Sequence, residues 1–139
     1  MNLGFLLLTD QSEAINGKVY VLGGGWNMLQ LPELPQEWGF GIAFGLDVPW
    51  NDTNRPHSLR LRIEDPDGET LGDEFSVDFE TGRPPGLTPG QDQRMVMSLA
   101  ARTTFASPGP HAVVIQVGEE EVGRTRFYVQ PSPRPASSS

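Results

Sequence analysis

Few residues in this sequence could carry out nucleophilic or acid–base chemistry. The 139 residues include no cysteine, and the only histidines are His57 and His111. Nucleophilic catalysis needs a nucleophile and a base within hydrogen-bond reach. Ser58 adjoins His57, but adjacent residues of a strand point to opposite faces, so they do not form a dyad. We therefore expect a protein that is not an enzyme and that has no cofactor.

Eight carboxylates and no basic residue occupy residues 64–80. An EF-hand loop needs carboxylates at fixed positions between two helices, and Asp65-Pro66-Asp67-Gly68 has neither that spacing nor helical flanks. Two interpretations stay open. One is a solvated acidic face, which we favour, and the other is a Ca²⁺ site carried by loops, as some β-sandwiches have.

The three tryptophans offer a different ligand chemistry, because aromatic rings stack on the faces of sugars. Trp26, Trp50 and the adjacent Asn51 are candidate residues for binding a carbohydrate or another small ligand. Each tryptophan also has a structural interpretation. Trp26 fits a core position opposite Leu7, and Trp38 and Trp50 fit the ends of sheets.

Composition restricts the partners and the fold class. The formal net charge of −8 argues against a nucleic-acid backbone or an anionic membrane as partner. The 16 glycines and 13 prolines, spread along the chain, argue against a helical bundle. The apolar run at residues 3–8 is too short and lacks the basic start of a secretory signal, so we expect a cytoplasmic protein. The nine arginines against one lysine are typical of GC-rich bacterial genomes.

The strongest turn signal lies near the N-terminus. Asn16-Gly17 predicts a two-residue hairpin loop between strands at 3–13 and 18–30, because both residues tolerate positive φ. The register that follows places Leu7 opposite Trp26. The Gly23-Gly24-Gly25 run matches no phosphate-binding motif, so we interpret it as a bulge within the second strand.

Two further segments have a period of two. Residues 40–48 alternate large apolar side chains, which we assign to the core, with a row of Gly41, Ala43, Gly45 and Asp47 that leaves room for something bulky. The Pro-containing segment 31–35 must cross between sheets. Residues 57–80 predict a hairpin around Asp65–Gly68 with a three-residue loop, which pairs Leu59 with Phe75 on one face.

The rest of the chain continues the same pattern. Residues 81–92 read as the longest loop, 93–105 as a strand and 111–129 as a last hairpin. The chain therefore predicts an all-β fold, an antiparallel β-sandwich of about eight strands in one domain at residues 1–130. Residues 131–139, rich in Pro and Ser, are expected to be disordered.

Two resemblances agree with this fold. The last hairpin resembles that of many immunoglobulin-like domains, without their Cys pair. The whole chain also resembles a family of small uncharacterised bacterial proteins, through Phe5–Asp10, Asn16–Gly24 and Leu61–Gly68. These motifs are mostly turns and core, so the resemblance implies a β-sandwich and no catalytic residue.

The first strand is the best candidate for a contact surface. Leu6 and Leu8 share one of its faces, while Phe5 and Leu7 occupy the other, although a two-layer fold buries only one face per strand. The second row must be covered by a loop such as Leu31–Leu34 or by another molecule. We expect a non-enzymatic binding or assembly module whose partner is another protein or a second copy in a homodimer, with Leu6 and Leu8 as contact residues.

Overall fold

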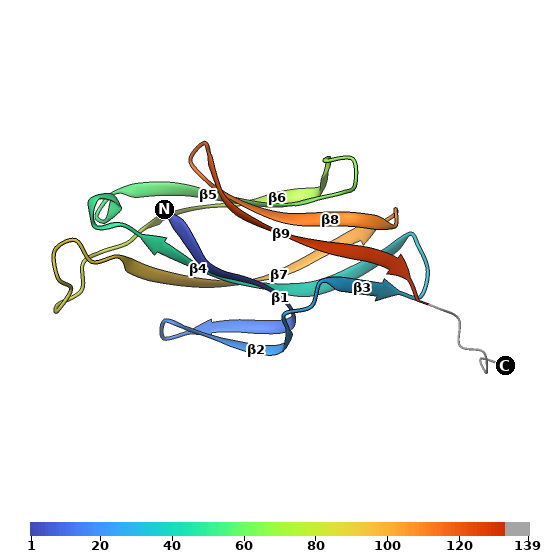
Figure 1. Ribbon diagram of the computed structural model, residues 1–139, viewed down its shortest axis with the longest axis horizontal. Helices are drawn as coiled ribbons and strands as arrows, with labels where there is room; N and C mark the ends of the chain where they lie inside the picture. Colours follow the sequence, from blue (N-terminus) through green and yellow to red (C-terminus); the bar gives the residue numbers. More distant parts are fainter. Residues whose placement is uncertain (133–139) are drawn as a thin grey trace.

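The computed structural model describes residues 1–132, which form nine strands and one short 3₁₀ helix (Figure 1). The strands are β1 (Asn2–Ile15), β2 (Lys18–Gly24), β3 (Met28–Leu31), β4 (Gln36–Val48), β5 (Pro56–Glu64), β6 (Thr70–Glu80), β7 (Gln93–Phe105), β8 (Gly109–Val117) and β9 (Glu120–Pro131). The 3₁₀ helix, η1, is Trp50–Asp52. The predicted all-β class is confirmed. Within residues 1–132, no helix has the length and apolar character that crossing a membrane requires.

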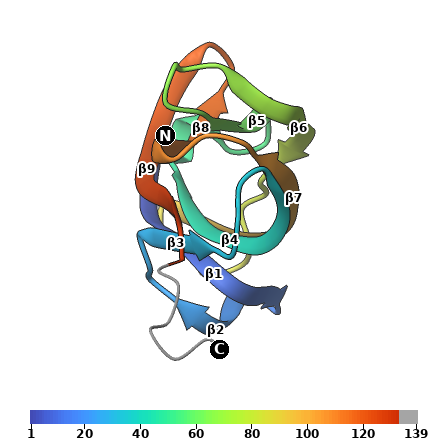
Figure 2. The same cartoon turned by 90° about the vertical axis from the view of Figure 1, so that its right-hand side faces the viewer.

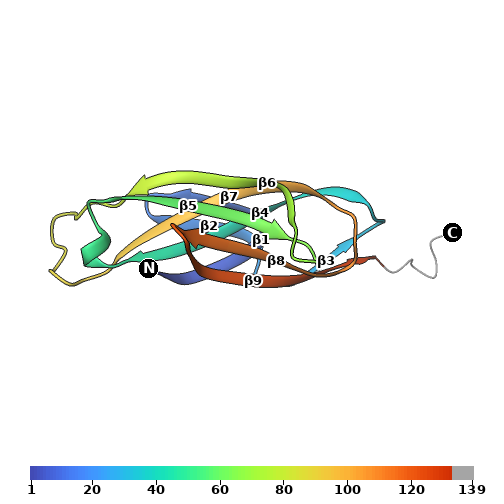
Figure 3. The same ribbon diagram turned by 90° about the horizontal axis from the view of Figure 1, so that it is seen from above.

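The strands form two sheets around a shared core. The first sheet has the order β2-β1-β4-β7 and the second the order β3-β9-β8-β5-β6. Figure 3 shows the strands of both sheets running along the long axis of the molecule. Neighbouring strands are antiparallel except β3, which lies parallel to β9, so the expectation of a wholly antiparallel fold was wrong at this edge.

The core is built from alternate residues of the long strands. On β4, Phe40, Ile42, Phe44, Leu46 and Val48 are at most 4% exposed, as the period of two predicts. They pack against apolar residues of β5, β8 and β9, including Leu59, Ile115 and Phe127. Burial of these side chains supplies the main favourable free energy of folding.

The β1–β2 hairpin has the predicted register only near its turn. Pairing runs from Ile15 and Lys18 to Thr9 and Gly24, where β2 ends. The predicted continuation of the second strand to residue 30 was wrong. Gly23 and Gly25 have φ values of 63° and 89°, which extended strands do not have, so these glycines end the strand rather than bulge within it.

After the glycines, the chain crosses to the other sheet. Met28 pairs with Tyr128 of β9 rather than lying opposite β1. The segment 31–35 then returns the chain to the first sheet at β4, as predicted. The loop at residues 81–92 also lies where the sequence predicts it.

The first strand bends after Thr9, and its second half folds back with β2 over the outer face of its own sheet. The pairing of β1 with β4 ends at Thr9 and Gly41. Figures 1 and 2 show the hairpin on the side of the first sheet that faces away from the second sheet. There Ser12 of the hairpin lies 2.7 Å from Ser98 of β7, hydroxyl to hydroxyl.

The outer face of β4 has room for this hairpin because its side chains are small. A Cβ atom on Gly41 would meet the hydroxyls of Thr9 and Ser12, and one on Gly45 would meet the Phe5 ring. Ala43, between them, is fully buried. The prediction that something bulky lies across this row is therefore confirmed, and the covering groups come from β1 of the same chain.

The β5–β6 hairpin has the predicted faces but a register shifted by two residues. Asp65 and Glu69 close the turn as expected, with the Asp65 amide donating to the Glu69 carbonyl at 2.9 Å. Beyond Ile63, an irregularity shifts the pairing, so Leu59 lies opposite Val77 rather than Phe75. Because the shift is even, the side chains keep their faces.

The C-terminal segment is ordered further than the sequence predicts. Pro131 pairs with Leu31, and the amide of Ser132 donates to the Leu31 carbonyl at 2.6 Å. The expectation of disorder from residue 131 was therefore wrong for these two residues. The remaining residues of that prediction, 133–139, lie outside the described residues.

Thr9 at the bend predicts a stabilising substitution. Its side chain is fully buried and its hydroxyl has no hydrogen-bond partner within the described residues. A buried hydroxyl without a partner costs about 1–3 kcal/mol, so Thr9→Val should raise the midpoint of thermal unfolding. Thr9→Ser, which keeps the hydroxyl and loses the methyl group, should lower it. A Thr9→Val variant that melts below the wild type would contradict this account.

The close packing of the hairpin on β4 predicts a destabilising substitution. A Cβ atom at Gly41 would lie 2.9 Å from the Ser12 hydroxyl and 3.2 Å from its backbone nitrogen. We expect Gly41→Ala to lower the free energy of unfolding, measured with urea, by about 1–3 kcal/mol. Gly82→Ala is the control, since a Cβ there meets nothing within 4 Å. Equal stability of the two variants would show that the hairpin does not pack closely against β4 at Gly41.

Candidate protein-binding surface

The side chains of His57, Ser58 and His111, the residues considered for catalysis, each contact different neighbours and not one another. Nε2 of His57 is 2.7 Å from the Asp52 carbonyl, and its ring packs against Phe79. Ser58 points to the other face of the sheet and donates to Asp78 at 2.7 Å. His111 is buried against the rings of Phe105 and Phe127. These contacts assign each of the three side chains a role in packing or in the sheet.

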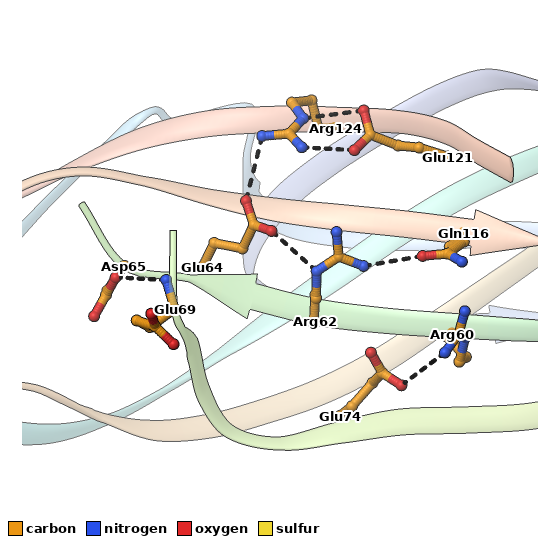
Figure 4. A network of polar contacts seen from close by, with 9 residues as sticks. All are labelled: Arg60, Arg62, Glu64, Asp65, Glu69, Glu74, Gln116, Glu121 and Arg124. Atoms are coloured by element: carbon orange, nitrogen blue, oxygen red, sulfur yellow. Dashed lines mark hydrogen bonds and ion pairs between the residues drawn. The ribbon is translucent and has the colours of Figure 1, made fainter. Parts of the chain in front are cut away.

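The carboxylates of residues 64–80 contribute to a polar network on the outer face of the second sheet (Figure 4). Glu64 accepts hydrogen bonds from Arg62 at 3.0 Å and from Arg124 at 3.3 Å. Arg60 pairs with Glu74 at 3.9 Å. Among residues 1–132, no three histidine or acidic side chains gather into a group that could hold a metal ion.

The network also covers apolar residues on the outer face of this sheet. Val114 lies between Arg62 and Arg124 in the strand register, and its exposed fraction is 0%. The aliphatic parts of long basic side chains cover apolar surface in this way while their charged ends stay at the solvent. Arg62 and Arg124, which both donate hydrogen bonds to Glu64, therefore cover apolar surface on the outer face of this sheet.

The tryptophans do not form a common ligand site. Trp26 packs against the rings of Phe40 and Phe127, with centroid distances of 5.7 and 6.2 Å. The Arg83 guanidinium lies 3.8 Å above the ring centroid of Trp50. Asn51 is exposed, and its carbonyl accepts a hydrogen bond from Arg55.

Trp38 is the most exposed tryptophan, at 38%, and borders a hollow of about 340 Å³ together with Arg102. It lies at the start of β4, whereas Trp50 follows the end of that strand. At about 3.3 Å per residue, a strand of 13 residues holds them roughly 40 Å apart. One small ligand cannot contact both rings.

Leu6 and Leu8 face the interior. Leu8 is 2% exposed and belongs to the core, and Leu6 packs against that core. The alternation along β1 separates its two faces as predicted, but the pair expected to contact a partner is the inner one. These two leucines are therefore not available to a partner.

The two most exposed large apolar side chains of the described residues lie instead on the outer face of the hairpin. Leu22 is 67% exposed, Tyr20 is 57% exposed, and Ile15 on the paired strand is 43% exposed. We call these three residues the hairpin patch. A hollow of about 540 Å³ lies beside it, bordered by Tyr20 and Leu22 and by polar residues of β1 such as Gln11 and Glu13.

Tyr20 and Leu22 of the patch lie on β2, the least protected of the edge strands that the structure describes. Edge strands present unpaired backbone groups, and charges, prolines and short length protect them from unwanted pairing. Of the four edges, β6 has four carboxylates, β7 has two arginines and β3 has four residues followed by a proline. The charged residue of β2 is Lys18, which adjoins the turn.

Sequence reasoning missed the patch, although a signal for it was present. The predicted turn register places Tyr20 opposite Glu13 and Leu22 opposite Gln11. Cross-strand partners share a face, so two polar partners indicate that this face is solvated. Read in that way, the register predicts that Tyr20 and Leu22 are exposed.

Comparison with known proteins gives a family. Residues 4–130 match the protein family described as "Family of unknown function (DUF6941)". Because the match spans most of the chain, this protein belongs to that family. Among curated proteins, none is significantly similar in sequence.

Two solved structures show weak similarity to this chain. One is the Pseudomonas fluorescens alkylpurine DNA glycosylase AlkC bound to DNA containing an abasic site analog, with 17% identity and a TM-score of 0.40 over 75% of this chain and 28% of that one. The other is β-glucosidase from Listeria innocua in complex with glucose, with 14% identity and a TM-score of 0.42 over 75% of this chain and 15% of that one. The chain thus spans less than a third of either protein, and neither similarity supports an inference here.

The ion pair at the start of β9 predicts a pH dependence. Arg124 donates to both carboxylate oxygens of Glu121, at 2.6 and 3.1 Å, and these hydrogen bonds lower the pKa of that carboxyl below its usual value. A carboxyl with a lowered pKa in the folded state stabilises the fold above its usual pKa and loses this contribution as the pH falls through the lowered value. Exposed pairs contribute about 0.2–1 kcal/mol.

We therefore expect Glu121→Gln to reduce the free energy of unfolding at neutral pH by this small amount, and the difference from wild type to vanish in acid. Urea titrations at both pH values measure it. The control is Glu119→Gln, an exposed carboxylate that makes no ion pair within the described residues. A difference between wild type and Glu121→Gln that persists in acid would assign the effect to something other than this charge.

Proposed function

We propose that this protein is a non-enzymatic binding module that acts through protein–protein contacts made by the β1–β2 hairpin. The observation that supports this function is the hairpin patch. Its residues Tyr20 and Leu22 are the two most exposed large apolar side chains of the described chain, and both lie on an edge strand with little protection. Exposed apolar groups gathered on one surface are typical of interaction sites.

Two surface ion pairs shift the pKa values of their members. The hydrogen bond to Asp47 raises the pKa of Arg94, and the hydrogen bonds between Arg124 and Glu121 raise the pKa of Arg124 and lower that of Glu121. Catalytic acids and bases are usually buried in clefts with strongly perturbed pKa values. The observed shifts belong instead to exposed ion pairs, one between the neighbouring strands β4 and β7 and one within β9.

The alternative functions have weaker support. Carbohydrate binding would rest on Trp38 alone, because the rings of Trp26 and Trp50 are in contact with other side chains. A loop-borne Ca²⁺ site would compete with arginines for Glu64 and Glu74. Protein binding needs neither assumption.

We extend the proposal to the finer architecture and to the location. An immunoglobulin-like sandwich is supported by the two sheets and by the antiparallel β8–β9 hairpin at the end of the chain. The parallel pairing of β3 and β9 is an addition to that pattern. A cytoplasmic bacterial protein remains the prediction from the sequence.

Site-specific photo-crosslinking in the cells that make the protein tests this function. A photoreactive phenylalanine analogue would replace Tyr20 in the full chain, and the matched control would replace Tyr128, which is 49% exposed on the other sheet. We expect a discrete adduct of higher mass from position 20, identified by mass spectrometry, and none from position 128. Adding Leu22→Lys should reduce the yield of that adduct.

The proposal fails if position 20 gives no adduct or gives the same products as position 128. A chain that has lost its fold would also give no adduct, so the melting temperature of each variant is measured first. Both substituted side chains are exposed, and we therefore expect the melting temperatures to stay close to that of the wild type.

A further inference from the structure

We infer that the partner of the β1–β2 hairpin is a second copy of this chain, joined through antiparallel pairing of the two β2 strands. This inference rests on the proposed function, because it names the occupant of the same surface. Pairing across a two-fold axis places the same residues of both copies in contact. The free edge of β2 therefore has to be complementary to itself.

The turn determines which backbone groups of β2 are free. In a two-residue hairpin the flanking pair, Ile15 and Lys18, is a hydrogen-bonded pair, and such pairs alternate with non-hydrogen-bonded ones along an antiparallel ladder. The N–H and C=O groups of Lys18, Tyr20 and Leu22 thus point to β1. Those of Val19 and Val21 point to the free edge.

A two-fold axis at Val21 makes Val21 of one copy a hydrogen-bonded pair with Val21 of the other. Val19 then lies opposite Gly23, whose φ of 63° ends the extended pairing there. Tyr20 then lies opposite Leu22 in a non-hydrogen-bonded pair, the closer kind, with Cα atoms about 4.5 Å apart. An axis at Tyr20 would instead place the charge of Lys18 opposite Leu22.

This register extends the apolar patch across the axis. The side chains of Tyr20 and Leu22 from both copies meet on the outer face, beside the hollow of about 540 Å³ that these residues border in each chain. Aromatic and aliphatic side chains directly opposite each other stabilise a strand pair. The two-fold axis forms this Tyr20–Leu22 contact twice in the dimer.

The local charge permits two copies to approach. The hairpin segment 10–24 has Asp10, Glu13 and Lys18 as its charged residues, a net charge of −1, although the whole chain has −8. Eight of the 18 carboxylates lie in residues 64–80, on and between β5 and β6 of the other sheet. At physiological salt, charges farther apart than about 8 Å are largely screened.

A seven-residue strand forms a small contact. Interfaces that bury less than about 1,200 Å² are typical of weak complexes, so we expect dissociation in the micromolar range. Sedimentation velocity of the wild type should therefore show a monomer–dimer equilibrium that depends on concentration. Leu22→Lys should weaken dimerisation about tenfold or more, because it places a charge in the apolar contact.

Engineered cysteines test the register directly, since the natural chain has none. A mixture of the Tyr20→Cys and Leu22→Cys variants should form a mixed disulfide on mild oxidation, because the paired Cα atoms lie within disulfide reach. Each variant alone should form much less dimer, because residues 20 and 20, or 22 and 22, are offset by two positions. Tyr128→Cys, mixed with either variant, is the exposed control.

A wild type that stays monomeric at all concentrations, together with no excess of the mixed disulfide over the Tyr128→Cys control, would overturn the self-pairing. The proposed function would survive that outcome if the photo-adduct from position 20 contained a different protein. It would fail as well if position 20 gave no adduct. A dimer that is unchanged by Leu22→Lys would also reject this inference, because its interface would lie elsewhere.

Discussion

The architecture depends on the small side chains along the outer face of β4. Gly41, Ala43 and Gly45 leave a shallow strip on which Phe5, Thr9 and Ser12 of the first strand lie. Larger residues in this strip would hold β1 away from its own sheet after the bend. Close packing here therefore determines that the hairpin folds back, and folding back in turn places β2 at an edge with Tyr20 and Leu22 turned to solvent.

Packing of β1 on this strip carries a free-energy penalty at Thr9. Its hydroxyl is buried at the bend, and no protein group among the described residues hydrogen-bonds to it. A native structure retains such a group only when the surrounding contacts outweigh the desolvation penalty. Here those contacts are the pairing of Thr9 with both Gly24 and Gly41, which makes this residue the junction between the hairpin and the sheet.

Local patterns in the sequence predicted the features that local interactions determine. The alternation in residues 40–48 identified the core face of β4, and the Asn16-Gly17 and Asp65–Gly68 turns gave both hairpins with the correct faces. The bend after Thr9 and the parallel pairing of β3 depend on contacts between distant segments. Nothing in the period or turn chemistry of residues 9–10 or 28–31 encodes them.

The candidate site shows the same division. Alternation separates the two rows of β1 but does not tell which row faces the core, so Leu6 and Leu8 were selected as contact residues although they lie inside. Which of the two rows is buried depends on the second sheet, because that sheet covers only one face of the first sheet. For Tyr20 and Leu22 the information was local, since their partners Gln11 and Glu13 are polar.

The parallel pairing of β3 with β9 has a consequence for synthesis of the chain. Met28 to Leu31 pair with Tyr128 to Pro131, so each residue of β3 meets its neighbour 100 positions later in the chain. At about 5–20 residues per second, a nascent β3 waits roughly 5–20 s for the strand that completes it. During this time the N-terminal hairpin is already made while the second sheet lacks its last strand. Closure of the second sheet around β9 therefore cannot begin until 100 further residues have been synthesised after β3.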